Sequence, residues 1–256
     1  MNQKTNEGSM KRVKIGNIKI GDGDVKICVS ISPTNKSELI EELYYATNSG
    51  CDIIEFRYDF WCDESYNVIA DENSYFKKNL PQSKPLLFTY RTKFEGGSGS
   101  DEHDVYEAIN TQAILSGNVD IVDIEFTKPP TLIQKLIDKA HEHGVTTLVS
   151  KHYFEKNLSE TEILEELLKM QETGADIIKL AVAAYDEQDA KNVINAAKEM
   201  YEKYAKVPII TIGMGEHGKI TRHIKPFYGS SMTYAKGMKA TASGQMSVAE
   251  LRGLGL

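Results

Sequence analysis

The sequence has few cysteines and no long apolar run. Three cysteines occur among 256 residues, at Cys28, Cys51 and Cys62, and no two of them have the C-x-x-C spacing of a zinc or redox site. An odd number of scattered thiols, two of them in apolar runs, predicts free cysteines in a reducing cytoplasm. No apolar run approaches the roughly 18 residues of a membrane span, and residues 1–8 lack the apolar core of a signal peptide. We therefore expect a cytoplasmic protein without a transmembrane segment.

Positive charge is also in deficit. Lysine and arginine total 30 against 37 aspartates and glutamates, which gives a formal net charge of -7. This balance argues against broad binding to nucleic acid or to an anionic membrane, so an anionic ligand requires a local basic site. A metal site is not expected either, because the cysteines are scattered and His141 and His143, two residues apart on a helix, cannot share a face.

What the sequence does contain is a regular alternation of apolar runs and longer amphipathic stretches. After a short hairpin at 13–20, strands are predicted at 25–31, 53–58, 86–90, 121–126, 146–151, 177–182, 208–212 and 232–235. Helices are clearest at 37–48, 101–117, 131–143, 159–173 and 187–205. This α/β pattern, eight strand-helix units in about 240 residues, predicts a (β/α)8 TIM barrel, with a doubly wound open sheet as the alternative. We expect residues 1–9 to be a disordered leader and residues 10–256 to form one domain.

Charged side chains interrupt several of the predicted strands. Glu55 and Arg57 lie two residues apart and so project from one face of the strand at 53–58. A buried carboxylate and guanidinium there could pair and hydrogen-bond a polyol, or form a purely structural ion pair. Arg91 and Glu95 follow the third strand, where a barrel keeps its active-site loops. The segment 91–97 is therefore either an anion site with an acidic partner or a solvated loop.

Lys179 is the most informative of these residues, because apolar residues flank it inside the strand at 177–182. Burial of an ammonium group is costly, so this lysine is expected to lose its proton more readily than in water. A neutral amine in a dry pocket is the nucleophile that forms a Schiff base with a ketone. The structural alternative is a lysine that extends to the strand end or pairs with Asp123 or Glu125, whose other candidate partner is Arg91.

His152 follows the fifth predicted strand, and strand parity turns Lys151 to the opposite side. Histidine can act as a general base near neutral pH. A single histidine at a strand end is more often structural, so both interpretations stay open.

The segment 217–249 contains no acidic residue, although the chain as a whole is acidic. Its basic residues are Lys219, Arg222, Lys225, Lys236 and Lys239. They predict a ligand that carries a carboxylate or phosphate, with Arg222 favoured for bidentate recognition, and the alternative is a surface helix whose counter-charges lie elsewhere. Residues 213–218 match G-x-G-x-x-G after a strand, but the acidic residue required about 20 positions later is missing, so nicotinamide binding is not expected.

Five features in this order resemble the type I 3-dehydroquinate dehydratases over nearly the whole chain. They are Glu55-Phe56-Arg57, Arg91-Thr92-Lys93-Phe94-Glu95-Gly96-Gly97, Ser150-Lys151-His152-Tyr153-Phe154, the strand lysine Lys179 and the tail up to Gln245. The resemblance implies a barrel that dehydrates 3-dehydroquinate to 3-dehydroshikimate. It also implies a homodimer that needs no cofactor, at the third step of the shikimate pathway of aromatic amino acid biosynthesis.

The resemblance implies a role for each matching residue. Lys179 is expected to form an imine with the substrate, His152 to act as general acid and base, and Glu95 to hold or polarise that histidine. Arg222 is expected to bind the substrate carboxylate, and Gln245 to belong to a closing loop. The substrate-binding positions implied are Glu55, Arg57, Arg91, Met214, Arg222, Thr241 and Gln245.

Two departures from the family pattern stand out. Thr241-Ala242-Ser243-Gly244-Gln245 replaces the familiar Ser-Ala-Pro-Gly-Gln, which keeps the first hydroxyl but loses a proline that would stiffen the loop. Lys151 replaces an aromatic residue before the histidine, with little effect expected because it points outward. The alternative functions are a class I aldolase, which also uses a barrel lysine, and a non-catalytic anion-binding barrel in which Lys179 is ion-paired.

Overall fold

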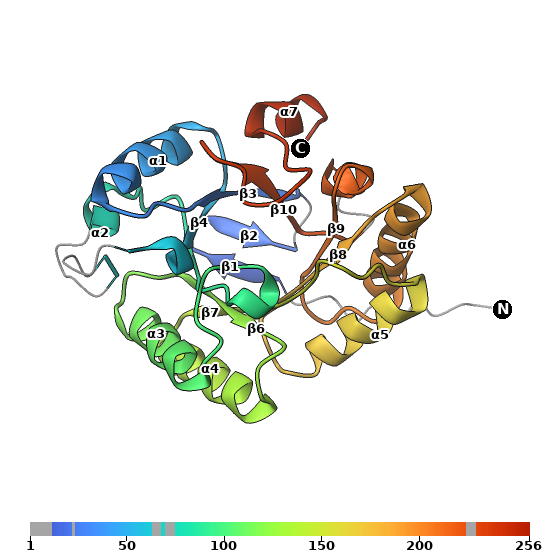
Figure 1. Ribbon diagram of the computed structural model, residues 1–256, viewed down its shortest axis with the longest axis horizontal. Coiled ribbons are helices and arrows are strands. Elements are labelled where there is room, and N and C mark those ends of the chain that lie inside the picture. Colours follow the sequence, from blue (N-terminus) through green and yellow to red (C-terminus); the bar gives the residue numbers. More distant parts are fainter. Residues whose placement is uncertain (1–11, 22–23, 63–67, 70–74, 224–228) are drawn as a thin grey trace.

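A computed structural model describes residues 12–21, 24–62, 68–69, 75–223 and 229–256 (Figure 1). The main sheet contains eight strands in the order β10-β3-β4-β5-β6-β7-β8-β9, each parallel to its neighbours. Their bounds are β3 Lys26–Ile31, β4 Ile53–Arg57, β5 Leu86–Thr89, β6 Ile121–Glu125, β7 Thr146–Tyr153, β8 Ile177–Ala183, β9 Ile209–Met214 and β10 Met232–Lys236. The strands form a ring, and helices surround it on the outside (Figure 1).

The helices have clear start signals in the sequence. The Ser159 and Glu162 side chains form a capping box at the start of α5, and the Asp186 side chain accepts from the backbone N–H of Asp189 at the start of α6. No helix in the described part of the chain is both long and apolar enough to cross a lipid bilayer. The helix bounds are α1 Lys36–Asn48, α2 Tyr75–Asn79, α3 His103–Leu115, α4 Pro130–Glu142, α5 Glu160–Gln171, α6 Glu187–Lys203 and α7 Val248–Gly253.

The barrel and its hairpin confirm the predicted fold, and the open-sheet alternative is wrong. One boundary differs in a way that affects the site: β7 extends to Tyr153, past the predicted end at 151. The extension forms because His152 and Tyr153 pair with Ala181 and Val182 of β8, a contact that local sequence does not reveal. The expected leader, residues 1–9, lies outside the described residues, and the assignment of 10–256 to one domain stays a prediction.

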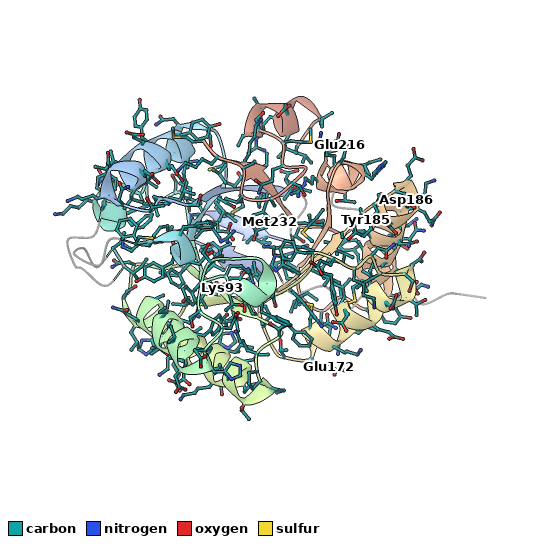
Figure 2. The ribbon with its side chains drawn as sticks, viewed as in Figure 1. Lys93, Glu172, Tyr185, Asp186, Glu216 and Met232 are labelled. Carbon is teal, nitrogen blue, oxygen red and sulfur yellow. The ribbon has the colours of Figure 1, made fainter. Side chains whose placement is uncertain are left out.

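Apolar side chains pack both outside and inside the ring. The outer layer fills the space between strands and helices. The inner cluster has a lower layer with one residue from each strand, namely Cys28, Ile53, Leu87, Ile121, Leu148, Ile177, Ile210 and Met232, and Figure 2 shows Met232 near the middle of the molecule. The hairpin of β1 (Val13–Ile15) and β2 (Ile18–Ile20) packs onto this layer through three buried apolar side chains, Val13, Ile15 and Ile20, and the partly buried Ile18. The hairpin therefore closes the end of the barrel where the strands begin.

The ring is less tightly joined between β9 and β10 than elsewhere. The other neighbouring strands pair in continuous ladders, whereas the described residues show a single bridge here, between Ile209 and Ser230. The Ser231 N–H donates to the Ile209 carbonyl oxygen over 2.8 Å. We refer to this place as the seam of the barrel.

Candidate active site

The inward-facing side chains change character along the strands. Two residues beyond the apolar lower layer, the inward positions hold Ser30, Glu55, Thr89, Asp123, Ser150, Lys179, Ile212 and Tyr234. All except Ile212 carry a polar group, so a polar layer lies directly above an apolar floor. Because parallel strands end together at one mouth of the barrel, loop residues add to this layer from above.

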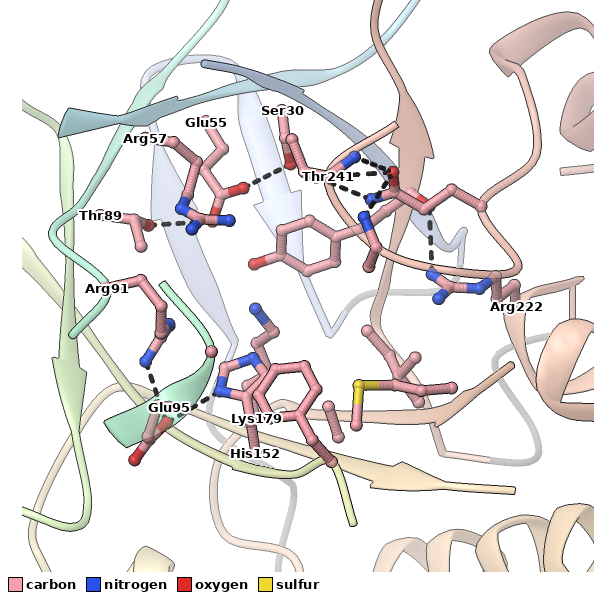
Figure 3. A pocket seen from close by; sticks show the side chains of 18 residues that line it. Ser30, Glu55, Arg57, Thr89, Arg91, Glu95, His152, Lys179, Arg222 and Thr241 are labelled. Atoms are coloured by element: carbon pink, nitrogen blue, oxygen red, sulfur yellow. Dashed lines mark hydrogen bonds and ion pairs between the residues drawn. The ribbon is translucent and has the colours of Figure 1, made fainter. Parts of the chain in front are cut away.

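A cavity lies over the polar layer, lined by the 18 residues drawn in Figure 3. All ten site residues predicted from the sequence line it: Glu55, Arg57, Arg91, Glu95, His152, Lys179, Met214, Arg222, Thr241 and Gln245. Residues up to 190 positions apart therefore meet at one place. Their chemical roles stay predictions, but their juxtaposition is a property of the fold.

Lys179 lies at the bottom of the cavity and is 5% exposed. Its Nζ lies 4.1 Å from the centroid of the Tyr234 ring. Burial lowers the pKa of Lys179, although the carboxylates of Glu55 and Asp123 oppose the shift. Among the described residues no carboxylate lies within ion-pair distance of this nitrogen. The alternative in which Asp123 or Glu125 holds the lysine is therefore wrong.

The two carboxylates have Arg91 as their partner instead. Nη2 of this arginine lies 2.7 Å from an oxygen of Asp123, and Nη1 lies 3.1 Å from Glu95 and 3.2 Å from Glu125. Burial alone would lower the pKa of Arg91, but these three carboxylates outweigh it and raise the pKa well above its ordinary value. Of the two partners that the sequence allowed for Asp123 and Glu125, the structure has Arg91. Lys179 forms no ion pair with the described residues.

His152 and Glu95 lie next to each other in the lining of the cavity. Nδ1 of His152 lies 2.9 Å from Oε2 of Glu95, and the Glu95 Oε1 accepts a hydrogen bond from the Thr127 hydroxyl over 2.7 Å. Burial, reinforced by the nearby Arg91 and Lys179 charges, lowers the pKa of His152 well below its ordinary value. The ring is therefore neutral near pH 7, and a proton on Nδ1 facing the carboxylate leaves Nε2 free to accept one.

The neighbouring residues hold this histidine in place. Its ring stacks on Phe154 with centroids 5.8 Å apart and an angle of 14° between the planes. Lys151 points to the outside of the barrel, as predicted, where its Nζ lies 2.6 Å from an oxygen of Glu166 on α5. The departure from the family pattern at Lys151 therefore lies outside the cavity.

The expectation that Glu55 and Arg57 pair with each other is wrong. Arg57 donates through Nε and Nη2 to the two oxygens of Asp59, each over 2.8 Å. Glu55 accepts from the hydroxyls of Thr89, over 2.9 Å, and Ser30. Side chains two apart on a strand point in parallel rather than toward each other, whereas the 3₁₀ turn η1 (Tyr58–Phe60) brings Asp59 back to Arg57.

Asp59 also holds the loop above the cavity. Its oxygens accept from the backbone N–H groups of Ser98, over 3.0 Å, and Arg91, over 3.3 Å. Sequence reasoning missed this residue, although the Arg57-Tyr58-Asp59 spacing after a strand is a signal that could have pointed to it.

Arg222 differs from the other arginines of the site. It is 2% exposed, and its hydrogen bonds go to the carbonyl oxygens of Tyr234, over 3.4 Å, and Ser243, over 3.2 Å. No carboxylate pairs with it among the described residues, and its Nε has no partner there. Burial lowers the pKa of Arg222 to about 10. A buried guanidinium without a counter-charge is a receptor for an anionic group.

The predicted basic patch of the tail is not a single patch. Lys219 pairs with Glu216 on the surface, and Lys239 pairs with Glu38 and Glu42. Lys236 is exposed, and Lys225 lies outside the described residues. Only Arg222 of this segment contributes its charge to the cavity lining described here.

The G-x-G-x-x-G match serves packing. A Cβ on Gly218 would lie 2.2 Å from the Gly213 carbonyl oxygen, so glycine lets the 3₁₀ segment η3 (His217–His223) turn directly back onto β9. This turn brings Arg222 to the cavity, beside Met214 on the wall.

The loop 241–245 covers the cavity beside Arg222. Oε1 of Gln245 accepts from the backbone N–H of Thr241 over 2.9 Å, and its Nε2 donates to the Thr241 hydroxyl over 3.1 Å. Gly244 has a φ of 74°, and a Cβ there would lie 2.4 Å from the Gly215 carbonyl oxygen. The loop therefore closes against the turn after β9 without the proline of the familiar pattern.

Sequence reasoning missed several lining residues, Ser30, Thr89 and Tyr234 among them. Each is an uncharged residue of a strand that is largely buried, so the sequence gives no reason to separate it from the core. These residues point inward at the same level as Glu55 and Lys179. The sequence reveals this only once the register between neighbouring strands is known. Among the described residues, no three or more His, Cys, Asp or Glu side chains gather as a metal site, and the absence of a metal or cofactor stays a prediction.

A barrel with a buried lysine, a histidine–carboxylate pair and an unpaired arginine at the carboxyl ends of its strands is the architecture of a (β/α)8 enzyme. Residues 27–254 match the family model described as type I 3-dehydroquinase. The chain belongs to the type I 3-dehydroquinase family, which is a family of hydro-lyases.

Individual relatives agree with the family model. The chain is 36% identical to a 3-dehydroquinate dehydratase of Alkaliphilus oremlandii over 95% of its length and 96% of the relative's. It is 35% identical to that of Clostridioides difficile, with 94% of each covered. A crystal structure of the type I 3-dehydroquinate dehydratase from Clostridium difficile, with covalently modified comenic acid, superimposes with a TM-score of 0.88 at 34% identity over 96% of both chains. The enzyme from Geobacillus kaustophilus gives 0.89 at 28% identity, also over 96% of both.

Proposed function

We propose that this chain dehydrates 3-dehydroquinate to 3-dehydroshikimate through an imine on Lys179, as the third step of the shikimate pathway. The observation that carries the proposal is the unpaired, buried Lys179 in one cavity with the His152–Glu95 pair and the unpaired Arg222. The names of the relatives supply the substrate, and the geometry supplies the parts that this reaction needs.

The first step requires a neutral amine. Because burial lowers the pKa of Lys179, a larger share of this lysine is neutral than in water. Its Nζ attacks the C3 ketone carbon, and the carbonyl oxygen leaves as water after proton transfer, which gives an iminium. The iminium withdraws electrons from the adjacent C2 and so acidifies its protons.

The second step requires a base that then becomes an acid. Neutral His152 removes a C2 proton through Nε2, while Glu95 stabilises the imidazolium that forms. In the resulting enamine, the nitrogen lone pair re-forms the C=N bond to C3 and the C2=C3 electrons form a C1=C2 double bond. The C1 hydroxyl takes the proton from His152 and leaves as water. Hydrolysis of the imine releases the product and restores Lys179, so protons and water balance.

The surrounding residues orient the substrate. Arg222 binds the carboxylate, and Gln245 and Thr241 close over it. Arg57 uses Nε and Nη2 for Asp59, which leaves Nη1 for a substrate hydroxyl. Glu55 and Arg91 bind further hydroxyls, and Met214 forms an apolar wall. A homodimer and a cytoplasmic location remain part of the proposal.

The decisive experiment is borohydride reduction in the presence of 3-dehydroquinate, followed by peptide mass spectrometry, because reduction converts a transient imine into a stable amine. The expected result is a substrate-derived adduct on Lys179 and turnover of 3-dehydroquinate but not of sugar phosphates. Turnover of sugar phosphates would indicate a class I aldolase. Binding without an adduct, from folded protein, would indicate a non-catalytic barrel.

A further inference from the structure

Tyr234 on β10 is a buried tyrosine whose hydroxyl has no hydrogen-bond partner in the described part of the chain. The residue is 4% exposed and lines the cavity. Other buried tyrosines of the barrel are satisfied: the Tyr106 hydroxyl accepts from the Glu125 N–H over 2.9 Å, and that of Tyr90 from the Ser100 N–H over 2.7 Å. A buried phenol usually finds a partner because an unmade hydrogen bond is costly. The exception therefore calls for a partner that enters the cavity.

The surroundings of Tyr234 define what that partner is. The Lys179 nitrogen lies 4.1 Å from the centroid of its ring, so Tyr234 neighbours the part of the cavity in which the lysine would hold its substrate carbon. Burial, reinforced by the Glu55 carboxylate, raises the pKa of Tyr234 well above its ordinary value, so the phenol keeps its proton and can donate it in a hydrogen bond.

Glu55 supplies the complementary acceptor, on β4, which is separated from β10 in the ring by β3 alone. Both of its oxygens already accept one hydrogen bond, from Thr89 and from Ser30. A carboxylate has about four acceptor sites, so each oxygen can accept another. A donor and an acceptor that share one corner of a cavity recognise a hydroxyl group, which accepts from the first and donates to the second.

We propose that Tyr234 determines substrate specificity together with Glu55, by binding the hydroxyl on the carbon next to the one that Lys179 attacks. The inference rests on the proposed function: in 3-dehydroquinate this group is the C4 hydroxyl. It stays on the ring through every step, whereas the C3 oxygen leaves when the imine forms. Tyr234 thus selects ketones that carry a neighbouring hydroxyl over ketones that lack it.

The test compares Tyr234→Phe with the unchanged protein on two substrates, 3-dehydroquinate and its 4-deoxy analogue. The substitution removes the hydroxyl and keeps the ring under Lys179. With 3-dehydroquinate, kcat/KM is expected to fall about tenfold, the effect of one hydrogen bond. With the 4-deoxy analogue, the two proteins are expected to have equal kcat/KM. An equal loss on both substrates, or no loss on either, would overturn the proposal.

Thr233→Val is the matched control. Thr233 precedes Tyr234 on β10, and its buried hydroxyl also lacks a partner among the described residues, but it does not line the cavity. Its loss is expected to leave kcat/KM unchanged on both substrates. Neither variant should unfold at a lower temperature than the parent, because each removes an unsatisfied buried group. If the parent protein itself formed no Lys179 adduct, the proposed function would fail; if only the substrate dependence of Tyr234→Phe were absent, the specificity proposal alone would fail.

Discussion

Two side chains with lowered pKa values, Lys179 and His152, line the same cavity, and the proposed mechanism uses each in its neutral form. Both side chains owe their lowered pKa values first to burial; the positive charge of Arg91 adds to both shifts, and that of Lys179 adds to the shift of His152. The cavity therefore provides a nucleophile and a base at the same pH, which amines and imidazoles in water do not.

The role of His152 can be separated from that of Lys179. In His152→Ala, imine formation should persist, because the lysine and its surroundings are unchanged, whereas kcat should fall by about 10² to 10⁴, the contribution of a general acid–base group. Adduct trapping and steady-state kinetics measure the two effects. His141→Ala, which alters an exposed histidine paired with Asp176, serves as control. Full turnover by His152→Ala would remove this histidine from the mechanism.

The pH dependence of kcat/KM should report Lys179. Its pKa is lowered, and imine formation needs the neutral amine, so activity is expected to fall as pH drops through that pKa and to level off above it. Asp123→Asn removes a carboxylate that favours the ammonium form and leaves Arg91 less compensated. Both effects lower the pKa of Lys179 further, so the fall of kcat/KM on the acidic side of the pH profile, its acidic limb, moves to lower pH.

A matched charge change outside the barrel tests whether the change in the pH profile arises from a charge near Lys179. Glu166→Gln removes a carboxylate on α5 that pairs with Lys151. Its pH profile should coincide with that of the unchanged protein. A limb that stays in place in Asp123→Asn, or moves equally in Glu166→Gln, would contradict the assignment of the limb to Lys179.

At the scale of elements, the turn after β4 supports the loop after β5. Asp59 lies in η1 and accepts hydrogen bonds from Arg57 and from the backbone at 91 and 98. Asp59→Ala leaves the buried Arg57 without its counter-charge, so the free energy of unfolding should fall by about 3 kcal/mol. Denaturant titration measures this. Glu187→Ala, which breaks an exposed pair with Lys191 on α6, should change it by less than about 0.5 kcal/mol.

We expect the loop 241–245 to contribute to substrate binding more than to folding. In Gln245→Ala, the hydrogen bonds to Thr241 are lost and the loop closes less well, so KM for 3-dehydroquinate should rise about tenfold. Thermal unfolding should change little, because the loop lies outside the barrel core. Gln188→Ala, on the exposed face of α6, is the control glutamine. Unchanged kinetics in Gln245→Ala would exclude the closing role.

The whole molecule separates a stabilising end from a chemical end. The hairpin packs three buried apolar side chains onto the apolar lower layer of the barrel. Every predicted site residue lies at the other mouth. Ile20 is fully buried, so Ile20→Ala should lower the free energy of unfolding by about 2 to 5 kcal/mol. The kcat and KM of the folded protein should not change. Lys14→Ala, on the exposed side of the hairpin, should affect neither, and altered kinetics in Ile20→Ala would show that the two ends are coupled.

The barrel could be predicted from the alternation of strands and helices, and Glu55, Arg57 and Lys179 because charges that interrupt an apolar run are visible in a single strand. Met214, Thr241 and Gln245 came from the family resemblance alone. The hydrogen-bond and ion-pair partners of the site residues could not be predicted, because they depend on the register between strands. Arg91 meets Asp123 from 32 residues away, and Glu55 meets Ser30 and Thr89 on both neighbouring strands. Tyr234 escaped prediction for a related reason, since an aromatic residue in a strand resembles core until its inward direction is known.

The seam has a thermodynamic consequence for ligand binding. Arg222 follows β9 on one side of the seam, and Tyr234 lies on β10 on the other side. A molecule that contacts both residues links the two strands between which the described backbone forms a single bridge. A ligand that binds only the folded protein adds its binding free energy to the stability of that state, so a substrate bound as proposed is expected to stabilise the barrel at the seam.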